Sequence, residues 1–192
     1  ISARNNLEDT SQLEDVIWGN VTQIGEQGAC LARSAVLYSD LDQSVPGLSV
    51  NRFCASGLEA VNLAANQVKG GAGNAYIAGG VESMSRVPMG MDGGAIAVDP
   101  YLAMKSYFVP QGISSDIIAT KYGFNRDDCD AYAVESHKRA VAATKAGYFE
   151  RSRVAVRDQN GLEILSMDEQ IREGTNMQGL GALNPSFKAM GE

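Results

Sequence analysis

The sequence predicts an α/β fold in which helices pack against the faces of a sheet. Short apolar runs of strand character alternate along the first 80 residues with stretches of helical spacing. Strands that alternate with helices in this way form layered α/β domains. The composition agrees, because 192 residues with 44% apolar and 20% charged side chains suit a soluble globular chain that buries a core.

Three strands and a first helix are expected in the N-terminal part. An apolar run at residues 16–18 ends at a Gly-Asn pair, and residues 27–37, rich in Ala and Leu, predict a helix. A second strand at residues 48–51 follows a Pro-Gly turn. Residues 75–78 predict a buried third strand that ends in two glycines.

The helix between the second and third strands has the clearest pattern. Ser56 and Glu59 fit a capping box at its start, and Gly70-Gly71 provides a stop. Its apolar side chains recur at intervals of three, four and three residues, at Leu58, Val61, Ala65 and Val68.

The second half of the chain is less regular. Residues 87–110 contain Pro, Gly and Met without a clear period, which predicts a long excursion from the sheet. Helices are expected at residues 114–121 and 126–146, the latter capped by Asn125 and followed by acidic residues. The segments 153–157 and 162–165 flank an Asp-Gln-Asn-Gly turn and predict a hairpin.

Composition disfavours several classes of function. A net charge of -7 and a pI near 4.8 give no global positive field for nucleic acid, and no run of about 18 apolar residues suggests a membrane span. The three cysteines are far apart, which predicts free thiols in a reducing, cytoplasmic compartment. With one histidine, His137, and no C-x-x-C, we expect no metal site. The glycines at 70–73 follow a helix, so a dinucleotide site is disfavoured.

Basic residues concentrate in the window 138–157, which holds six basic and one acidic side chain. A charge run of this kind is more often a solvated helix face. A local patch for an anionic ligand is the alternative.

Cys54 is placed where a thiolate nucleophile belongs. It follows a predicted strand and precedes a helix, whose unpaired N–H groups and macrodipole stabilise an anion. From this position alone, a small buried structural thiol is the more common interpretation, because free cysteines are among the most buried residues. His137 lies among charged residues and is more typical of a surface histidine.

Two long motifs change that balance. Asn51-Arg52-Phe53-Cys54-Ala55-Ser56-Gly57-Leu58-Glu59-Ala60, followed by Ala78-Gly79-Gly80-Val81-Glu82-Ser83-Met84-Ser85, closely resembles the nucleophile segment and the next strand-loop of the thiolase family. The resemblance continues through residues 111–116 and 148–149 to Leu183-Asn184-Pro185-Ser186-Phe187 and covers nearly the whole chain. It implies a layered α/β/α domain with a mixed sheet plus an irregular, mostly helical loop domain.

The resemblance also implies a reaction. Thiolases transfer an acyl group between 3-ketoacyl-CoA or acetyl-CoA and coenzyme A, which places them in fatty acid metabolism without a tightly bound cofactor. The cysteine that matches Cys54 carries the acyl group as a thioester. Cys30 and Cys129 match no catalytic position and are expected to be structural. By residue-to-residue match, the coenzyme A contacts are Arg172, Gly179, Phe187 and Gln111, the last standing where relatives commonly have Met.

The family pattern further predicts residues 1–86 as a partial first catalytic domain that lacks its opening strand, and residues 87–192 as the loop domain that holds coenzyme A. The second half of the family's chain is expected to be absent, so the isolated chain is expected to lack turnover. A homodimer or tetramer is implied as well. A non-catalytic coenzyme A-binding or assembly module with a thiolase-like fold is the alternative.

Overall fold

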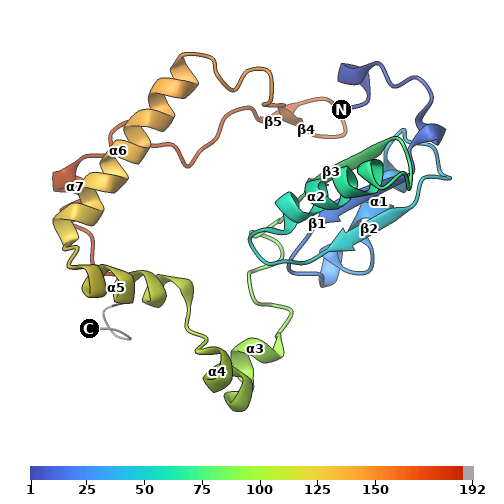
Figure 1. The fold of residues 1–192 in the computed structure, drawn as a ribbon. Coiled ribbons are helices and arrows are strands. Elements are labelled where there is room, and N and C mark those ends of the chain that lie inside the picture. The colour runs from blue at the N-terminus through green and yellow to red at the C-terminus, as the bar shows by residue number, and fades with distance from the viewer. Residues whose placement is uncertain (188–192) are drawn as a thin grey trace. The chain divides into compact units, whose positions relative to one another are not determined.

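The computed structural model describes residues 1–187 and forms two compact units, Ile1–Ser106 and Tyr107–Glu192. The first unit is built on three parallel strands, β1 (Asp15–Gly19), β2 (Gly47–Val50) and β3 (Tyr76–Gly80), in the order β2-β1-β3 (Figure 1). These strands confirm the three expected from the sequence. All three run parallel, so the described part of this sheet is not mixed.

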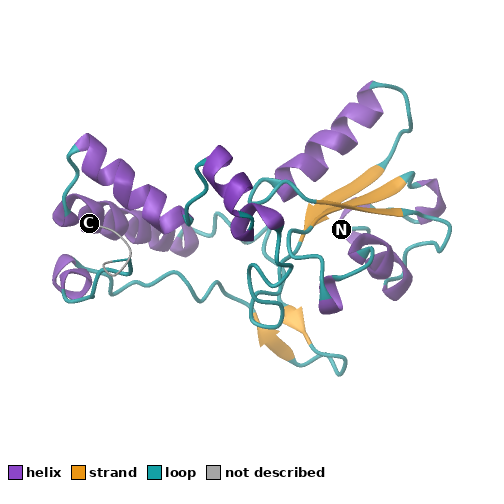
Figure 2. Cartoon of the chain, turned by 90° about the horizontal axis from the view of Figure 1, so that it is seen from below, coloured by secondary structure: helices purple, strands orange, loops and turns teal. Residues whose placement is uncertain are grey.

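Two helices cover the two faces of the sheet, as the alternation of side chains along β1 requires (Figure 2). On one face Val16 packs in a cluster with residues of α1 (Leu31–Tyr38). On the other face its neighbour Ile17, which is fully buried, packs on Ala60 and Ala64 of α2 (Ser56–Lys69). The layered α/β architecture is thereby confirmed for this unit.

The helix α2 buries small residues and exposes large ones. Its buried positions are Ser56, Ala60 and Ala64, which allow the helix backbone to approach the sheet closely. The exposed fractions of Leu58, Val61 and Val68 are 65%, 49% and 46%. The apolar spacing that predicted the helix therefore marks a face that nothing within the unit covers.

The start of α1 differs from the expectation of residue 27. Residues Gly25–Gln27 form a short 3-10 turn, and Ala29 has a left-handed backbone with φ 54°. Because an alanine in that region interrupts a right-handed helix, α1 begins only at Leu31. The Gln27 side chain is instead buried in the loop.

Two short helices, α3 (Ala95–Val98) and α4 (Pro100–Ser106), fall within the segment expected to be irregular. Both helices belong to the first compact unit, which ends at Ser106, and the domain boundary at residue 86 that the family resemblance implies stays a prediction. Among the described helices, none is long and apolar enough to cross a membrane.

The second unit is mostly helical. It contains α5 (Gln111–Tyr122), α6 (Arg126–Lys145) and α7 (Met177–Gly181), and its small hairpin pairs β4 (Val156–Arg157) with β5 (Glu163–Leu165). The expected cap on α6 is confirmed, because Asn125 accepts the Asp128 N–H and the Asp128 carboxylate accepts the Asn125 N–H.

The core is unevenly divided between the units. Every buried apolar side chain of the described residues lies in the first unit. In the described part of the second unit, the one buried residue is Asp130, which pairs with Arg126 at 2.9 Å.

Replacing Gly19 by Ala is expected to destabilise the first unit. A methyl group there would lie 2.5 Å from the backbone of Ser56 and of Gly57, and overpacking of this kind costs about 1–3 kcal/mol. Gly57→Ala is the matched control, since its methyl group meets nothing within 4 Å and a helix favours Ala over Gly. Urea denaturation measures both, and equal stability of the two variants would contradict the close approach.

Candidate active site

The loops that follow the three parallel strands meet at one edge of the sheet. They begin at Asn20 after β1, Asn51 after β2 and Val81 after β3. From the central strand β1, the chain passes to β2 on one side, and β3 then pairs on the other side. The carboxyl edge beside such a reversal is where ligands bind in open α/β sheets. This edge of the first unit is therefore its candidate site.

Cys54 lies in the loop from β2 to α2, next to a left-handed residue. Phe53 has φ 49°, which is unfavourable for a side chain of its size. Three hydrogen bonds hold it there. The Asn51 side chain accepts its N–H at 2.9 Å, and its carbonyl accepts from the N–H and the hydroxyl of Ser56 at 3.0 and 2.5 Å.

The capping box expected from Ser56 and Glu59 is wrong. The residue that caps α2 is Ala55, which makes no side-chain hydrogen bond to the helix. The buried Ser56 hydroxyl accepts the Arg52 N–H at 2.9 Å, and Glu59 forms an ion pair with the Arg52 side chain at 2.8 Å. Ser56 and Glu59 thus bind Arg52 within the loop that carries Cys54 instead of capping the helix.

Cys54 is exposed and precedes Ser56, the first residue of α2, by two positions. The first regular helical hydrogen bond runs from the Glu59 N–H to the Ala55 carbonyl at 2.8 Å, and the Ser56 N–H donates to the Phe53 carbonyl. The N–H groups of Gly57 and Leu58 therefore lie at the electropositive start of the helix. Cys54 is therefore not buried within the described residues, as the interpretation of a small buried thiol requires. Cys30, by contrast, is partly buried and lies 3.2 Å from the Gly47 carbonyl, to which it donates.

A polar cluster beside this loop was not predicted from the sequence. The Glu82 carboxylate accepts from the N–H groups of Val21 and Thr22 and from the side chains of Asn20 and Gln27. Burial would raise the pKa of Glu82, but the hydrogen bonds from Val21, Gln27, Thr22 and Asn20 outweigh it and hold the pKa below its usual value. The sequence signal was Glu82 in the Val-Glu-Ser-Met loop. Its hydrogen-bond partners are 55 to 62 residues away in the sequence, so no local pattern predicted its contacts.

In the second unit, two of the expected coenzyme A contacts line the same pocket. Arg172 and Gly179 lie around a cavity of about 360 Å³, together with Asn176 and Leu183. The Asn176 side chain accepts the Gly179 N–H at 2.9 Å and so fixes the start of α7. The sequence thus selected two residues, seven positions apart, that the fold brings to one surface.

The other two expected contacts are also close to each other. A methyl group at Gly112 would collide with the ring of Phe187, so this aromatic side chain lies directly on the start of α5. Gln111, the first residue of α5, is the neighbour of that glycine and is exposed. Residues 111 and 187 therefore form a second local group within the unit.

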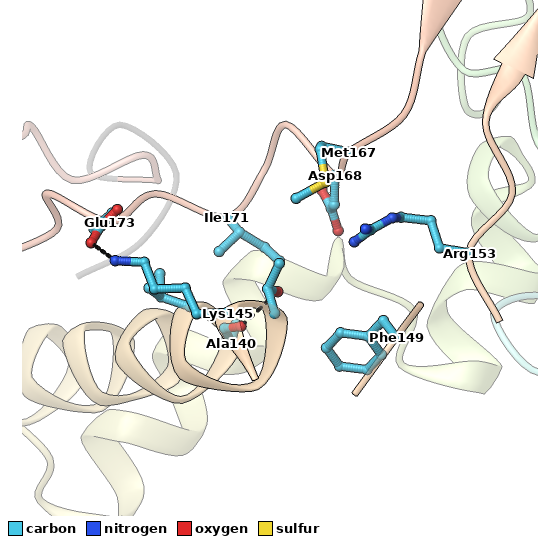
Figure 3. Close-up of a pocket in the computed structure, with 10 residues that line it drawn as sticks. Ala140, Lys145, Phe149, Arg153, Met167, Asp168, Ile171 and Glu173 are labelled. Carbon is cyan, nitrogen blue, oxygen red and sulfur yellow. Dashed lines mark hydrogen bonds and ion pairs between the residues drawn. The ribbon is translucent and has the colours of Figure 1, made fainter. Parts of the chain in front are cut away.

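The basic window is largely neutralised. Lys138 and Arg139 both pair with Glu135. Further along, Lys145 pairs with Glu173 beside a pocket of about 490 Å³, into which Phe149 and Ile171 project (Figure 3). These pairings support the solvated-face interpretation over a patch for anions.

His137 is half-buried on α6, and its Nδ1 accepts the Arg172 N–H at 3.2 Å. The second unit thus uses the chain's single histidine to hold the segment that carries Arg172. Among the described residues, no group of three or more His, Cys, Asp or Glu side chains could hold a metal ion.

Comparison with known proteins identifies the family. A model described as "Thiolase, N-terminal domain" matches residues 3–192. The chain belongs to the thiolase family. The 3-ketoacyl-CoA thiolases of Acinetobacter baylyi and Chromohalobacter salexigens are 39% and 37% identical to it, over 98% and 94% of this chain.

The fold agrees with the thiolase assignment. The dimeric peroxisomal thiolase of Saccharomyces cerevisiae superposes with a TM-score of 0.81 and 32% identity over 96% of this chain. The match covers 48% of that structure, and 49% and 47% of the two bacterial relatives. The chain therefore spans about half the length of these thiolases.

Cys54 is expected to be the fastest of the three thiols to react with iodoacetamide. It combines exposure with the electropositive start of a helix, whereas Cys129 is exposed within α6 and Cys30 is partly buried. Limited labelling of the folded protein followed by peptide mass mapping measures the three rates. Faster modification of either other cysteine would contradict this prediction.

Proposed function

We propose that this chain carries the acyl-accepting half of a thiolase site, with Cys54 as the nucleophile. The observation that carries the proposal is an exposed cysteine at the start of α2, in a strained loop at the carboxyl edge of a parallel sheet. Strain held in place by several hydrogen bonds is typical of functional loops. Membership of the thiolase family supplies the reaction class.

The chemistry is the transfer of an acyl group to the Cys54 sulfur as a thioester. With acetyl-CoA, the sulfur attacks the thioester carbonyl carbon, a new carbon–sulfur bond forms, and the bond to the sulfur of coenzyme A breaks. With a 3-ketoacyl-CoA, the sulfur attacks the 3-keto carbon, a new carbon–sulfur bond forms, and the bond between C2 and C3 breaks, so that acetyl-CoA leaves. The leaving group departs with the proton that the Cys54 thiol gives up, which makes acyl-Cys54 the intermediate. Backbone N–H groups at the start of α2 are suited to stabilise the oxyanion of the addition step.

Coenzyme A binding is assigned to the second unit. Arg172 offers a cation for a phosphate group and lies with Gly179 in one cavity. Phe187 offers an apolar surface beside Gln111 for the pantetheine arm. Three free thiols support a reducing, cytoplasmic setting for such an enzyme.

A complete reaction needs more groups than these. Carbon–carbon bond formation requires a base near the thiol and an acceptor for the α-proton. The first unit contains no histidine, and the outer face of α2 is uncovered at Leu58, Val61 and Val68. We infer that further polypeptide packs on this face and supplies the missing groups.

The alternative is a coenzyme A-binding or assembly module without Claisen chemistry. One observation favours it, namely that the single histidine has its Nδ1 engaged by the Arg172 N–H in the second unit. The two functions differ in whether Cys54 takes up an acyl group from a thioester.

The isolated chain is expected to show no thiolase turnover, while Cys54 is slowly acylated by a reactive thioester. A positioned acid or base typically contributes about 10²–10⁴ in rate, and two such groups are missing. Loss of acetoacetyl-CoA absorbance with added coenzyme A measures turnover, and mass mapping after treatment with S-(4-nitrophenyl) thioacetate measures acylation. Cys54→Ala is the control for both.

The outcomes separate the two candidates. Acetylation at Cys54 that disappears in Cys54→Ala supports the nucleophile. Absence of any acylated Cys54 in the folded chain would favour the binding module. Cys54-dependent turnover by these 192 residues alone would show that the count of missing groups is wrong.

Self-association of the isolated chain is expected, because a helix face with exposed leucine and valine side chains tends to be covered. Leu58→Asp should shift the chain towards monomer. Asn66→Asp is the matched control, since it adds the same charge to α2 away from the apolar face. Sedimentation distinguishes the states, and a wild-type monomer near 20 kDa at high concentration would contradict the prediction.

A further inference from the structure

We propose that Glu82 is a positioning residue for Cys54, acting through the turn after β1 and the Asn51 side chain. This inference rests on the proposed role of Cys54 as the acyl-accepting nucleophile. Glu82 itself touches neither the thiol nor the reacting atoms. Its role follows from a chain of hydrogen bonds that crosses the carboxyl edge of the sheet.

The first link joins the loop after β3 to the turn after β1. Oε1 of Glu82 accepts from the N–H groups of Val21 and Thr22, the latter at 3.3 Å, and from the Asn20 side chain at 3.1 Å. Oε2 accepts from the Gln27 side chain at 3.0 Å. Asn20 is fully buried and Gln27 is 3% exposed, so these partners are themselves held in place.

Gln27 closes the cluster from its other end. Its amide also donates to the Thr22 carbonyl at 2.9 Å, and its Oε1 accepts the Ser83 N–H at 2.5 Å. The turn after β1 is therefore fixed on both sides by one carboxylate and one amide. Without the Glu82 carboxylate, the N–H groups of Val21 and Thr22 lose this acceptor, whereas the Asn20 and Gln27 amides keep the carbonyls of Val81 and Thr22.

The second link joins that turn to the nucleophile loop. The Val21 carbonyl accepts from the Asn51 side chain at 3.2 Å, and Oδ1 of the same Asn51 accepts the Phe53 N–H at 2.9 Å. Glu82 thus fixes the position of Val21 through its N–H, and the Val21 carbonyl in turn fixes the Asn51 side chain. Phe53 is the residue with φ 49° that immediately precedes Cys54.

Strain explains why this support matters. A left-handed backbone at a bulky residue costs of order 1–3 kcal/mol and persists only where its surroundings enforce it. Loss of the Asn51 hydrogen bond removes one of the three that hold Phe53, which then relaxes in part, and Cys54 moves relative to the start of α2. A displacement of about 1 Å can lower a rate by about 10²-fold when the reaction depends on orientation.

A carboxylate suits this place better than an amide. Four N–H donors converge on two oxygens, and a carboxylate offers only acceptors. In Glu82→Gln an NH₂ group faces at least one of these donors. The variant keeps the size of the side chain but removes one of the two oxygens that accept these hydrogen bonds.

The test compares two reactions of Cys54 in the full 192-residue chain. Acylation by S-(4-nitrophenyl) thioacetate needs an oriented thiol beside N–H donors, whereas alkylation by iodoacetamide needs only an accessible one. Glu82→Gln should lower the acylation rate about tenfold while alkylation changes less than about twofold. Glu26→Gln is the matched control, because Glu26 pairs with Arg86 outside the cluster and should leave both rates unchanged.

Two further variants test the path. Asn51→Ala should lower acylation as Glu82→Gln does, and the double variant should be no slower than either single one, because both break the same chain. Gln27→Ala, which leaves the carboxylate in place, should give a smaller loss, and it carries the test if Glu82→Gln does not fold by circular dichroism.

Each outcome has one meaning. Equal acylation rates in Glu82→Gln and Glu26→Gln, or effects of Glu82 and Asn51 that multiply in the double variant, would overturn the positioning role. A parallel loss of acylation and alkylation would also overturn it, since that indicates general disorder of the unit. If wild-type Cys54 is not acylated at all, the proposed function fails instead.

Discussion

The close approach between Gly19 and the first turn of α2 sets the position of the candidate nucleophile. A side chain at residue 19 would occupy the space of the Ser56 and Gly57 backbone, so only glycine lets the helix start directly over the end of β1. Small residues along the buried face of α2 continue this contact, with Ala60 and Ala64 against Ile17. The loop that carries Cys54 must therefore turn sharply between β2 and the helix.

The sharp turn is maintained by groups that lie far apart in the sequence. The hydrogen bond between Asn20 and Glu82 spans 62 residues, and that between Asn51 and Val21 spans 30. Parallel strands make these long-range hydrogen bonds possible, because the carboxyl ends of the strands meet at one edge of the sheet and the loops that follow them become neighbours. The position of Cys54 thus depends on the loops that follow all three strands. The surfaces around Arg172 and Phe187 are formed within the other unit by α5, α6 and the segment near α7.

Local signals in the sequence predicted the elements, and tertiary contacts decided the details. Strand and helix periods and the Asn125 cap depend on neighbours within a few residues, and these predictions hold. Ser56 and Glu59 have the spacing of a capping box, yet their partners are the Arg52 backbone and side chain, because the tight loop brings Arg52 closer than the helix N–H groups. The left-handed Phe53 and the role of Glu82 depend on long-range hydrogen bonds that no local pattern encodes.

The uneven division of buried apolar residues has a thermodynamic consequence. Heat capacity on unfolding rises with the apolar surface that becomes exposed, and the fully buried apolar side chains among the described residues belong to the first unit. The calorimetric signal of melting therefore originates mainly in the sheet and its two helices. Residues 107–187 are held by helix caps and ion pairs such as Arg126–Asp130 and contribute little to the cooperativity of unfolding. A ligand that binds to these residues therefore has the largest effect on how well ordered they are.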